Sequence, residues 1–256
     1  MSMPVEVILF SVLAAGIAVT SIAAEPVDKA KAKRCVIVWS EGTAPKNVYS
    51  NDINGAIVEG LTGKLEGWDI VRASLSDPDQ GIPDALLNRA DVLIWWGHKR
   101  HGNVKDELVA KIVKRVKEEG MGFISLHSSH FAKPNIALMG SPCSWGAYVG
   151  DSTTLKFSVT DESHPITKGL PKEFSLTHNE RYSDPYAVPP AKSIVLEGVA
   201  DLKNGKQDKS KQGFCWEIGK GKMFYFQAGH ETNPVFYDEN VRKIMLNAVL
   251  WAAPAK

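Results

Sequence analysis

Five of the seven histidines in this sequence follow apolar runs that have the composition of buried strands. These histidines are His98, His101, His127, His130 and His230. The runs that precede them are residues 92–96, 121–126 and 223–227. In open α/β sheets, ligands bind beyond the carboxyl ends of the strands. If the three runs are parallel neighbours in one sheet, the histidines share one crevice, and we expect them to do chemistry there.

The first chemistry that this grouping allows is metal binding. Neutral imidazole is the commonest metal ligand in proteins, and a site with three protein ligands leaves a position open for water or substrate. His98, His127 and His230 are the candidate ligands, and zinc is the first choice among divalent metals. An ion held there would polarise a carbonyl group of the substrate.

The second chemistry is general acid–base catalysis without a metal. His127 or His230 would pair with Glu180 or Glu231, and these four residues are the candidate catalytic groups. Four further residues are candidates for contact with the substrate because they are polar or aromatic and lie in or near the same loops. They are Trp96, His101, His130 and Tyr182.

Nucleophilic catalysis by serine or cysteine is disfavoured. The sequence has no Gly-x-Ser-x-Gly motif, Ser128 is not flanked by glycines, and Cys143 lacks a strand–elbow–helix setting. The three cysteines have wide spacing and form no CxxC pair. Cys35 and Cys215 lie in apolar runs and are expected in the core, and a Cys143–Cys215 disulfide is left open.

Strands and helices alternate through the first half of the chain. Buried strands are predicted from continuous apolar runs at residues 35–39, 68–73, 92–96 and 121–126. Helices are expected between them over residues 53–65, 83–87 and 106–119. Asn51 and Asp52 can cap the first helix, and Gly120 caps the last. This alternation predicts a doubly wound, mainly parallel α/β sheet with helices on both faces.

The second half of the chain is less regular. Residues 128–192 contain several prolines and loop-like stretches, with one strand expected at 154–160. A segment this long is either a functional lid or an irregular, β-containing insertion after the fourth strand. The elements that follow are strands, a charged hairpin tip and a helix. They are expected at residues 193–197, 205–211, 213–218, 223–227 and 240–252.

Composition and the N-terminal residues limit the partners and the cellular location that we expect. The 256 residues carry a formal net charge of +1 without a basic block, so nucleic acid is not an expected partner. Residues 1–24 have the apolar run and small residues of a secretory signal peptide, followed by a polar linker over 25–33. We therefore expect an exported domain over residues 34–256, periplasmic or extracellular and free of the membrane. Since no Lys or Arg precedes the apolar run, an uncleaved anchor is the alternative.

Several motifs, taken together and in order, resemble the trehalose-utilisation (ThuA-like) family. They are Trp95-Trp96-Gly97-His98, Leu126-His127-Ser128, His164-Pro165-Ile166, Glu180-Arg181-Tyr182 and Gly229-His230-Glu231. The resemblance covers nearly all of residues 34–253 and implies the flavodoxin-like fold of the class I glutamine-amidotransferase-like superfamily. The nucleophilic cysteine of that superfamily would fall at about His127-Ser128, so glutamine hydrolysis is not implied.

The resemblance also implies a function. The family is linked to the use of trehalose and related disaccharides through keto sugars that a partner dehydrogenase makes. We expect an exported sugar-processing enzyme, a hydrolase or lyase that acts on a disaccharide or its keto derivative without a nucleotide or flavin. A non-catalytic module that binds a small carbohydrate in the same crevice is the alternative, and a protein-interaction module is the third. One departure is Trp145-Gly146, where the family usually has Trp-Arg, so the substrate here can differ.

Overall fold

The computed structural model describes residues 33–149, 154–202 and 205–255. The predicted signal peptide over residues 1–24, and all but the last residue of the predicted linker, lie outside these described residues. No helix within them combines the length and the apolar character needed to cross a lipid bilayer.

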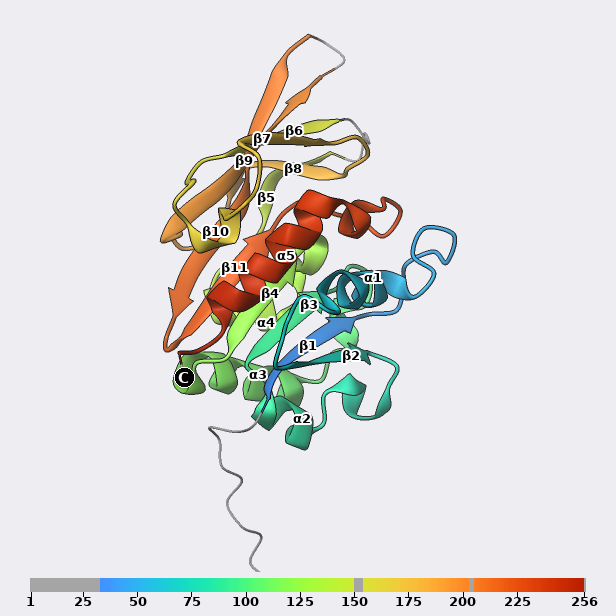
Figure 1. The fold of residues 1–256 in the computed structure, drawn as a ribbon. Coiled ribbons are helices and arrows are strands. Elements are labelled where there is room, and N and C mark those ends of the chain that lie inside the picture. The colour runs from blue at the N-terminus through green and yellow to red at the C-terminus, as the bar shows by residue number, and fades with distance from the viewer. Residues whose placement is uncertain (1–32, 150–153, 203–204, 256) are drawn as a thin grey trace, which may run out of the picture. The chain divides into compact units, whose positions relative to one another are not determined.

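One nine-stranded sheet, in the order β2-β1-β3-β4-β11-β10-β9-β6-β7, runs through the described residues (Figure 1). Its first five strands are parallel, and we call them the parallel half. They are β1 (Arg34–Ser40), β2 (Trp68–Ser74), β3 (Val92–Trp96), β4 (Gly122–Leu126) and β11 (Gly221–Phe226). Every residue of β3 and β4 is buried, as expected for strands covered on both faces. The predicted doubly wound, mainly parallel sheet is confirmed.

The remaining strands pair antiparallel, and together with a separate two-stranded sheet we call them the antiparallel half. In the large sheet they are β10 (Gln207–Ile218), β9 (Ser193–Asp201), β6 (Leu155–Val159) and β7 (Glu173–Leu176). The separate sheet consists of β5 (Trp145–Val149) and β8 (Arg181–Tyr186). Strands β5 to β8 make up the irregular, β-containing insertion that the sequence predicts after the fourth strand.

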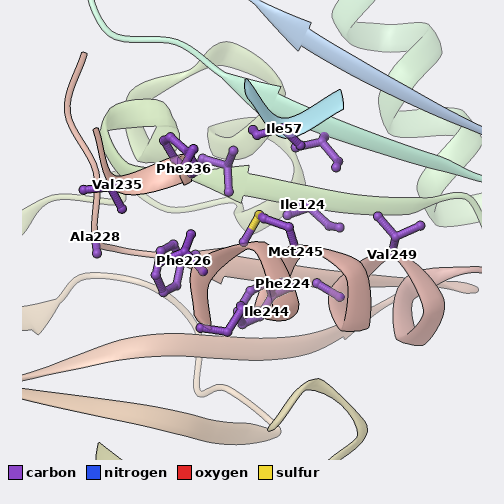
Figure 2. Packing of buried hydrophobic residues seen from close by; sticks show 14 of the residues in the cluster. Ile57, Ile124, Phe224, Phe226, Ala228, Val235, Phe236, Ile244, Met245 and Val249 are labelled. Carbon is purple, nitrogen blue, oxygen red and sulfur yellow. The ribbon is translucent and has the colours of Figure 1, made fainter. Parts of the chain in front are cut away.

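Helices cover both faces of the parallel half because the strands are apolar on both sides. One face packs against α1 (Asp52–Leu61) and α5 (Glu239–Ala252). The other packs against α2 (Asp84–Arg89), α3 (Asp106–Glu119) and α4 (Lys133–Met139). Figure 2 shows Met245 and Val249 of α5 in the same cluster as Ile124 and Phe224 of the sheet. The short 3-10 helices are η1 (Pro78–Gly81), η2 (His101–Asn103), η3 (His127–Phe131), η4 (Pro165–Thr167) and η5 (Val235–Tyr237).

An aromatic pair lies under the α2–α4 face of the parallel half. Trp39 of β1 and Trp95 of β3 are register partners, and their rings stack with centroids 3.7 Å apart and an angle of 18° between the planes. Both side chains are fully buried. The two rings therefore link the neighbouring strands β1 and β3 close to the ends where the candidate site begins.

Both ends of α1 differ from the sequence prediction. The helix ends at Leu61 rather than Leu65, and the Asn51 side chain makes no capping hydrogen bond. The Asp52 carboxylate turns toward the end of β1 instead, where it accepts hydrogen bonds from Ser40 Oγ and, at 3.0 Å, from the Ala44 backbone N–H. A short acidic side chain here stabilises the loop after β1 instead of capping the helix.

One further expectation from the sequence is wrong, and one question that it left open is settled. Residues 205–211, predicted as a hairpin tip, belong mostly to β10, which begins at Gln207 and pairs with β9 out to Asp201. The alternating polar residues of an exposed antiparallel strand resemble a loop in composition, which explains the error. The disulfide left open between Cys143 and Cys215 is not formed, since both are buried, free thiols.

Candidate functional site

The three strand ends predicted to open on one crevice lie side by side. β4 is flanked by β3 and β11, and the three strands run parallel. The register pairs Trp96 with Leu126 and Leu126 with Phe226, so the segments that follow begin at the same level of the sheet. His98, His127 and His230 are therefore brought together, with ring centroids 4.9 Å apart for His98 and His230 and 5.9 Å apart for His127 and His230.

A buried carboxylate from a fourth strand end holds the loop after β3. Glu41 follows β1 directly and is 1% exposed. Its Oε2 accepts backbone N–H groups of His98, Lys99 and Arg100 at 2.9, 2.8 and 2.9 Å. Gly97 permits this close approach, because a Cβ there would lie 2.9 Å from Glu41 Oε1. Sequence reasoning missed Glu41, although it stands at a strand end just as the histidines do.

A second buried carboxylate, Glu231, binds side chains of the same loop. Its Oε2 accepts a hydrogen bond from His98 Nδ1, and its Oε1 forms an ion pair with Lys99 Nζ at 2.6 Å. Burial alone would raise the pKa of Glu231, but these contacts lower it to about 2. Glu231 is therefore ionised at neutral pH. Because a carboxylate only accepts, neutral His98 carries its proton on Nδ1 and a lone pair on Nε2.

His127 occupies the elbow between β4 and η3, with a φ of +48°. Its Nδ1 donates to the Gln227 carbonyl at 2.7 Å, so neutral His127 has its lone pair on Nε2. That Nε2 accepts from the Tyr182 hydroxyl at 2.9 Å, while the Tyr225 hydroxyl donates to the His127 carbonyl at 2.8 Å. The ring is fully buried and fixed at both nitrogens, so it can gain a proton only at Nε2.

Gly229 lets the chain after β11 pass close to this elbow. A Cβ on Gly229 would lie 2.6 Å from His127 Cβ. The Gly229 backbone N–H donates to Asn179 Oδ1 at 2.9 Å, and Gly229 forms an isolated antiparallel β-bridge with Glu180. The bridge joins the antiparallel half to the strand ends of the parallel half, and it positions Glu180 beside the histidines.

Glu180 lies between two imidazoles. Its Oε2 is 3.2 Å from His230 Nε2, and its Oε1 is 3.6 Å from His127 Nε2. Burial would raise the pKa of Glu180, but protonated His127, as a hydrogen-bond donor at Nε2, and the positive charges that the other nearby histidines can carry lower it on balance. Its side chain is 23% exposed. Glu180 is therefore an ionised carboxylate within reach of solvent.

His230 is positioned as a proton donor toward Glu180. The Thr232 backbone N–H donates to His230 Nδ1 at 3.2 Å, and the Thr232 hydroxyl, 2.7 Å away, can donate to the same atom, so neutral His230 carries its proton on Nε2. That atom faces Glu180 Oε2 at 3.2 Å and Glu231 Oε2 at 3.6 Å. Burial lowers the pKa of His230, although Glu180 and Glu231 oppose the shift. The ring is therefore neutral at pH 7 and offers one N–H.

The predicted substrate contacts differ in how they meet solvent. Trp96 is fully buried in the core, with its ring 6.3 Å from that of His98, and it supports the site from beneath. His130 is also buried; its Nδ1 donates to the Cys143 carbonyl at 2.6 Å, and burial lowers its pKa to about 3. Tyr182 is 2% exposed, whereas the His101 side chain is 20% exposed. Among these four residues, His101 is the most accessible to a ligand.

Gln227 and Ser129 are further supporting residues that sequence reasoning missed. Gln227 Oε1 accepts the Tyr182 backbone N–H at 3.1 Å, and its Nε2 donates to the Tyr182 carbonyl at 2.8 Å. Ser129 Oγ accepts the Gly97 backbone N–H at 2.7 Å. A polar residue at the end of an apolar run was the available signal for Gln227. Gln227 fixes His127 through its backbone carbonyl and Tyr182 through its side chain.

One group of residues in the described part of the chain has the donors and spacing for a metal ion. Ligand atoms of His98, His230 and Glu231 lie within 4.8 Å of one another. Of the three histidines predicted as ligands, two therefore meet, and Glu231 stands in the third place. His127 lies outside this group, and its two nitrogens are hydrogen-bonded to Gln227 and Tyr182.

The comparisons with known proteins give the chain its family. The sequence matches the family described as "ThuA: Trehalose utilisation" over residues 35–252. The chain belongs to the ThuA family. The expected resemblance is confirmed, and family membership associates the chain with trehalose utilisation.

Solved structures support the fold of this ThuA-like chain. A protein described as ThuA-like from Bacteroides uniformis is 19% identical with a TM-score of 0.60, covering 89% of this chain and 95% of its own. Another from Parabacteroides merdae is 14% identical with a TM-score of 0.60, covering 86% and 89%. PurLQS from Thermotoga maritima is 13% identical with a TM-score of 0.51, covering 86% and 99%. No curated protein matches the chain. The flavodoxin-like, class I glutamine-amidotransferase-like fold is confirmed.

Proposed function

We propose that this ThuA-like protein is an exported enzyme that processes a disaccharide such as trehalose, or its keto derivative, by acid–base chemistry at Glu180 and His230. The observation that carries the proposal is an ionised, partly exposed carboxylate 3.2 Å from the protonated Nε2 of a neutral imidazole. Such a pair can take a proton at one atom and donate one at another. The family's association with trehalose utilisation supports a sugar as the substrate.

A keto sugar provides a reaction that these two groups can drive. Glu180 takes the proton from the carbon next to the carbonyl, and the C–H electron pair forms an enolate. Once Glu180 is protonated, the His230 Nε2–H is released from it and can donate to the enolate oxygen. Collapse of the enolate breaks the glycosidic C–O bond, and the leaving oxygen takes the proton back from Glu180. Addition of water to the new double bond turns this elimination into net hydrolysis.

The other candidate catalytic residues have supporting roles in this scheme. His127 Nε2 lies 3.6 Å from Glu180 Oε1, where it can exchange protons with that carboxyl group between turnovers. Glu231 fixes the tautomer of His98 and keeps its Nε2 free to accept a hydrogen bond from a sugar hydroxyl. His101, at the same loop, is a further contact for a hydroxyl group.

The test compares turnover by the wild type with that by Glu180→Gln, using trehalose and its keto derivative and following monosaccharide release by NMR. Removing a positioned acid–base group should lower kcat by about 100-fold or more. Glu173→Gln is the matched control, because Glu173 is exposed on β7 and should leave turnover unchanged. Full turnover by Glu180→Gln would refute the assignment. Sugar binding without turnover by the wild type would favour the alternative of a non-catalytic sugar-binding module.

A metal-assisted form of the same reaction is the second candidate, favoured by the grouping of His98, His230 and Glu231 within 4.8 Å. Two imidazoles and a carboxylate are donors that zinc accepts, and a bound divalent ion would supply a Lewis acid that polarises the carbonyl. His230 would have to lose the Nε2 proton that the Thr232 N–H now favours, or turn its ring. Elemental analysis after incubation with zinc should find one ion per chain in the wild type and none in Glu231→Gln.

Export and a partner dehydrogenase complete the proposal. The apolar run and small residues before residue 25 support a signal peptide, and a sugar-oxidising dehydrogenase would supply the keto sugar. Mass spectrometry of the chain expressed with its first 24 residues should find a new N-terminus near residue 25 in the exported fraction. An intact N-terminus held in the membrane fraction would favour the uncleaved anchor.

A further inference from the structure

Two exposed aromatic rings lie next to the candidate site without taking part in the proposed chemistry. In the described residues, the exposed large hydrophobic side chains are Phe131, Ile136, Tyr148 and Leu250. Phe131 is 40% exposed and Tyr148 50% exposed, and their ring centroids are 6.0 Å apart with an angle of 26° between the planes. Phe131 ends η3, whereas Tyr148 belongs to β5, so the fold brings the two rings together from separate segments.

Both rings are supported from behind by buried residues. The His130 ring is 4.0 Å from Phe131 and 5.8 Å from Tyr148, and its pKa of about 3 keeps it neutral under the pair. The Tyr148 hydroxyl accepts the Trp145 backbone N–H at 3.1 Å, which fixes the outer end of that ring. Rings that are held from behind and exposed in front can bind a flat apolar surface with little loss of conformational entropy.

Two buried rings, those of Tyr182 and His127, connect the pair to the candidate site. Tyr182 contacts Tyr148 on one side, with ring centroids 5.1 Å apart, and stacks on His127 on the other, at 4.8 Å. Only one ring therefore separates Tyr148 from His127, which lies beside Glu180. A disaccharide consists of two linked sugar rings, so a first ring at Glu180 leaves the second available for contact with the aromatic pair.

We propose that Phe131 and Tyr148 form a stacking subsite for the second sugar ring of a disaccharide whose first ring lies at Glu180. This inference rests on the proposed function, since it takes a disaccharide as the ligand. The electron-rich face of an aromatic ring attracts the C–H groups on the apolar face of a pyranose. Ligand sites combine such apolar contacts with a few polar groups that fix orientation, and here the histidines and Glu180 supply those groups.

The test measures trehalose binding by calorimetry in Glu180→Gln, so that turnover does not interfere. Adding Tyr148→Ala or Phe131→Leu should each weaken binding by about two- to tenfold, the range expected for loss of one aromatic contact. Phe131→Tyr keeps a ring and should bind like the parent. Leu250→Ala is the matched control, because Leu250 is 53% exposed on α5, away from the site.

Trehalose binding that is unchanged in both Tyr148→Ala and Phe131→Leu would overturn the subsite. So would loss of self-association in these variants, since the rings would then be an interface between copies of the chain. Absence of trehalose binding to the parent chain, which carries Glu180→Gln alone, would overturn both the subsite and the proposed function. Ring-dependent binding without turnover by the wild type would keep the subsite and refute only the reaction.

Discussion

The parallel half and the antiparallel half bury their strands differently, and the candidate site uses both arrangements. Every residue of β3 and β4 is buried, so these strands can present reactive side chains only beyond their ends. β7 alternates exposed and buried positions, and β5 exposes Tyr148 from within the strand. The reactive side chains of a strand covered on both faces must therefore lie in its end loop. A strand with one open face can expose a ligand-binding side chain at any position on that face.

This difference predicts what a substitution in each half should disturb. Glu41, Gly229 and Glu231 are buried in the end loops of the parallel half, where they hold backbone or other buried side chains. Glu180 and Tyr148 come from the antiparallel half and are partly exposed. Changes to the first group should lower the free energy of unfolding, and changes to the second should affect turnover or binding in a chain of nearly normal stability.

The largest effect on stability is expected at Glu41. Glu41→Ala removes the acceptor of three part-buried backbone N–H groups at once, and a donor left unpaired costs about 1–3 kcal/mol. The free energy of unfolding in urea should fall by about 4 kcal/mol. Glu41→Gln keeps an oxygen acceptor and should lose roughly half as much. A loss below about 1 kcal/mol in Glu41→Ala would break the contrast between the halves.

The next effect concerns the approach of Gly229 to His127. Gly229→Ala would put a Cβ 2.6 Å from His127 Cβ, and such overpacking costs about 1–3 kcal/mol. Gly102→Ala is the control because no atom lies within 4 Å of its added Cβ, so its stability should change by less than about 0.5 kcal/mol. Equal melting temperatures of the two variants would show that the chain after β11 can move away from the elbow freely.

The pH dependence of stability sharpens the role of Glu231. Its pKa falls from 4.5 to about 2 on folding, so the stability it contributes is complete above pH 4.5 and is lost as the pH falls toward 2. The difference in unfolding free energy between the wild type and Glu231→Gln should therefore shrink over this window by about 1 kcal/mol per pH unit. Urea denaturation at several pH values measures this difference. A difference that is constant from pH 5 to pH 2 would contradict the assigned ion pair with Lys99 and bond with His98.

The smallest effect is expected for a surface ion pair of the antiparallel half. Lys156 Nζ lies 3.0 Å from Asp201 Oδ2, and the two side chains are 62% and 60% exposed. An exposed pair of this kind contributes about 0–1 kcal/mol, so Lys156→Ala should change the unfolding free energy by less than about 0.5 kcal/mol. A larger loss would mean that the outer strands β6 and β9 depend on more than backbone pairing.

The two halves also differ in how well their structure could be predicted from sequence. The predicted bounds of β3 and α3 agree with the structure, because a continuous apolar run and a 3.6-residue period are strong local signals. β5, β7 and β8 were not predicted, since these strands are short and mix polar with apolar residues. Their positions depend on antiparallel partners far away in the chain, which no local pattern specifies.

Only those residues of the candidate site that follow strand ends were predictable from the sequence. The histidines and Glu231 follow apolar runs, and the rule that ligands bind at the ends of parallel strands brought them together correctly. Glu41 was not predicted as a site residue because its partners lie 57 to 59 residues later in the chain. A single acidic residue after a strand also forms no recognisable motif. The contact of Glu180 with His127 and His230 depends on the bridge to Gly229, which sequence could not reveal.

The stacked indoles of Trp39 and Trp95 provide the protein with an optical reporter. Two rings 3.7 Å apart, with an angle of 18° between their planes, couple their electronic excitations, so their bands in ultraviolet circular dichroism depend on the geometry of the pair. Trp39 stands two residues before Glu41, and Trp95 three residues before His98, so these bands depend on the spacing of the two strands that hold the site. Spectroscopy of the unlabelled protein can thus follow loosening of this region separately from loss of helix.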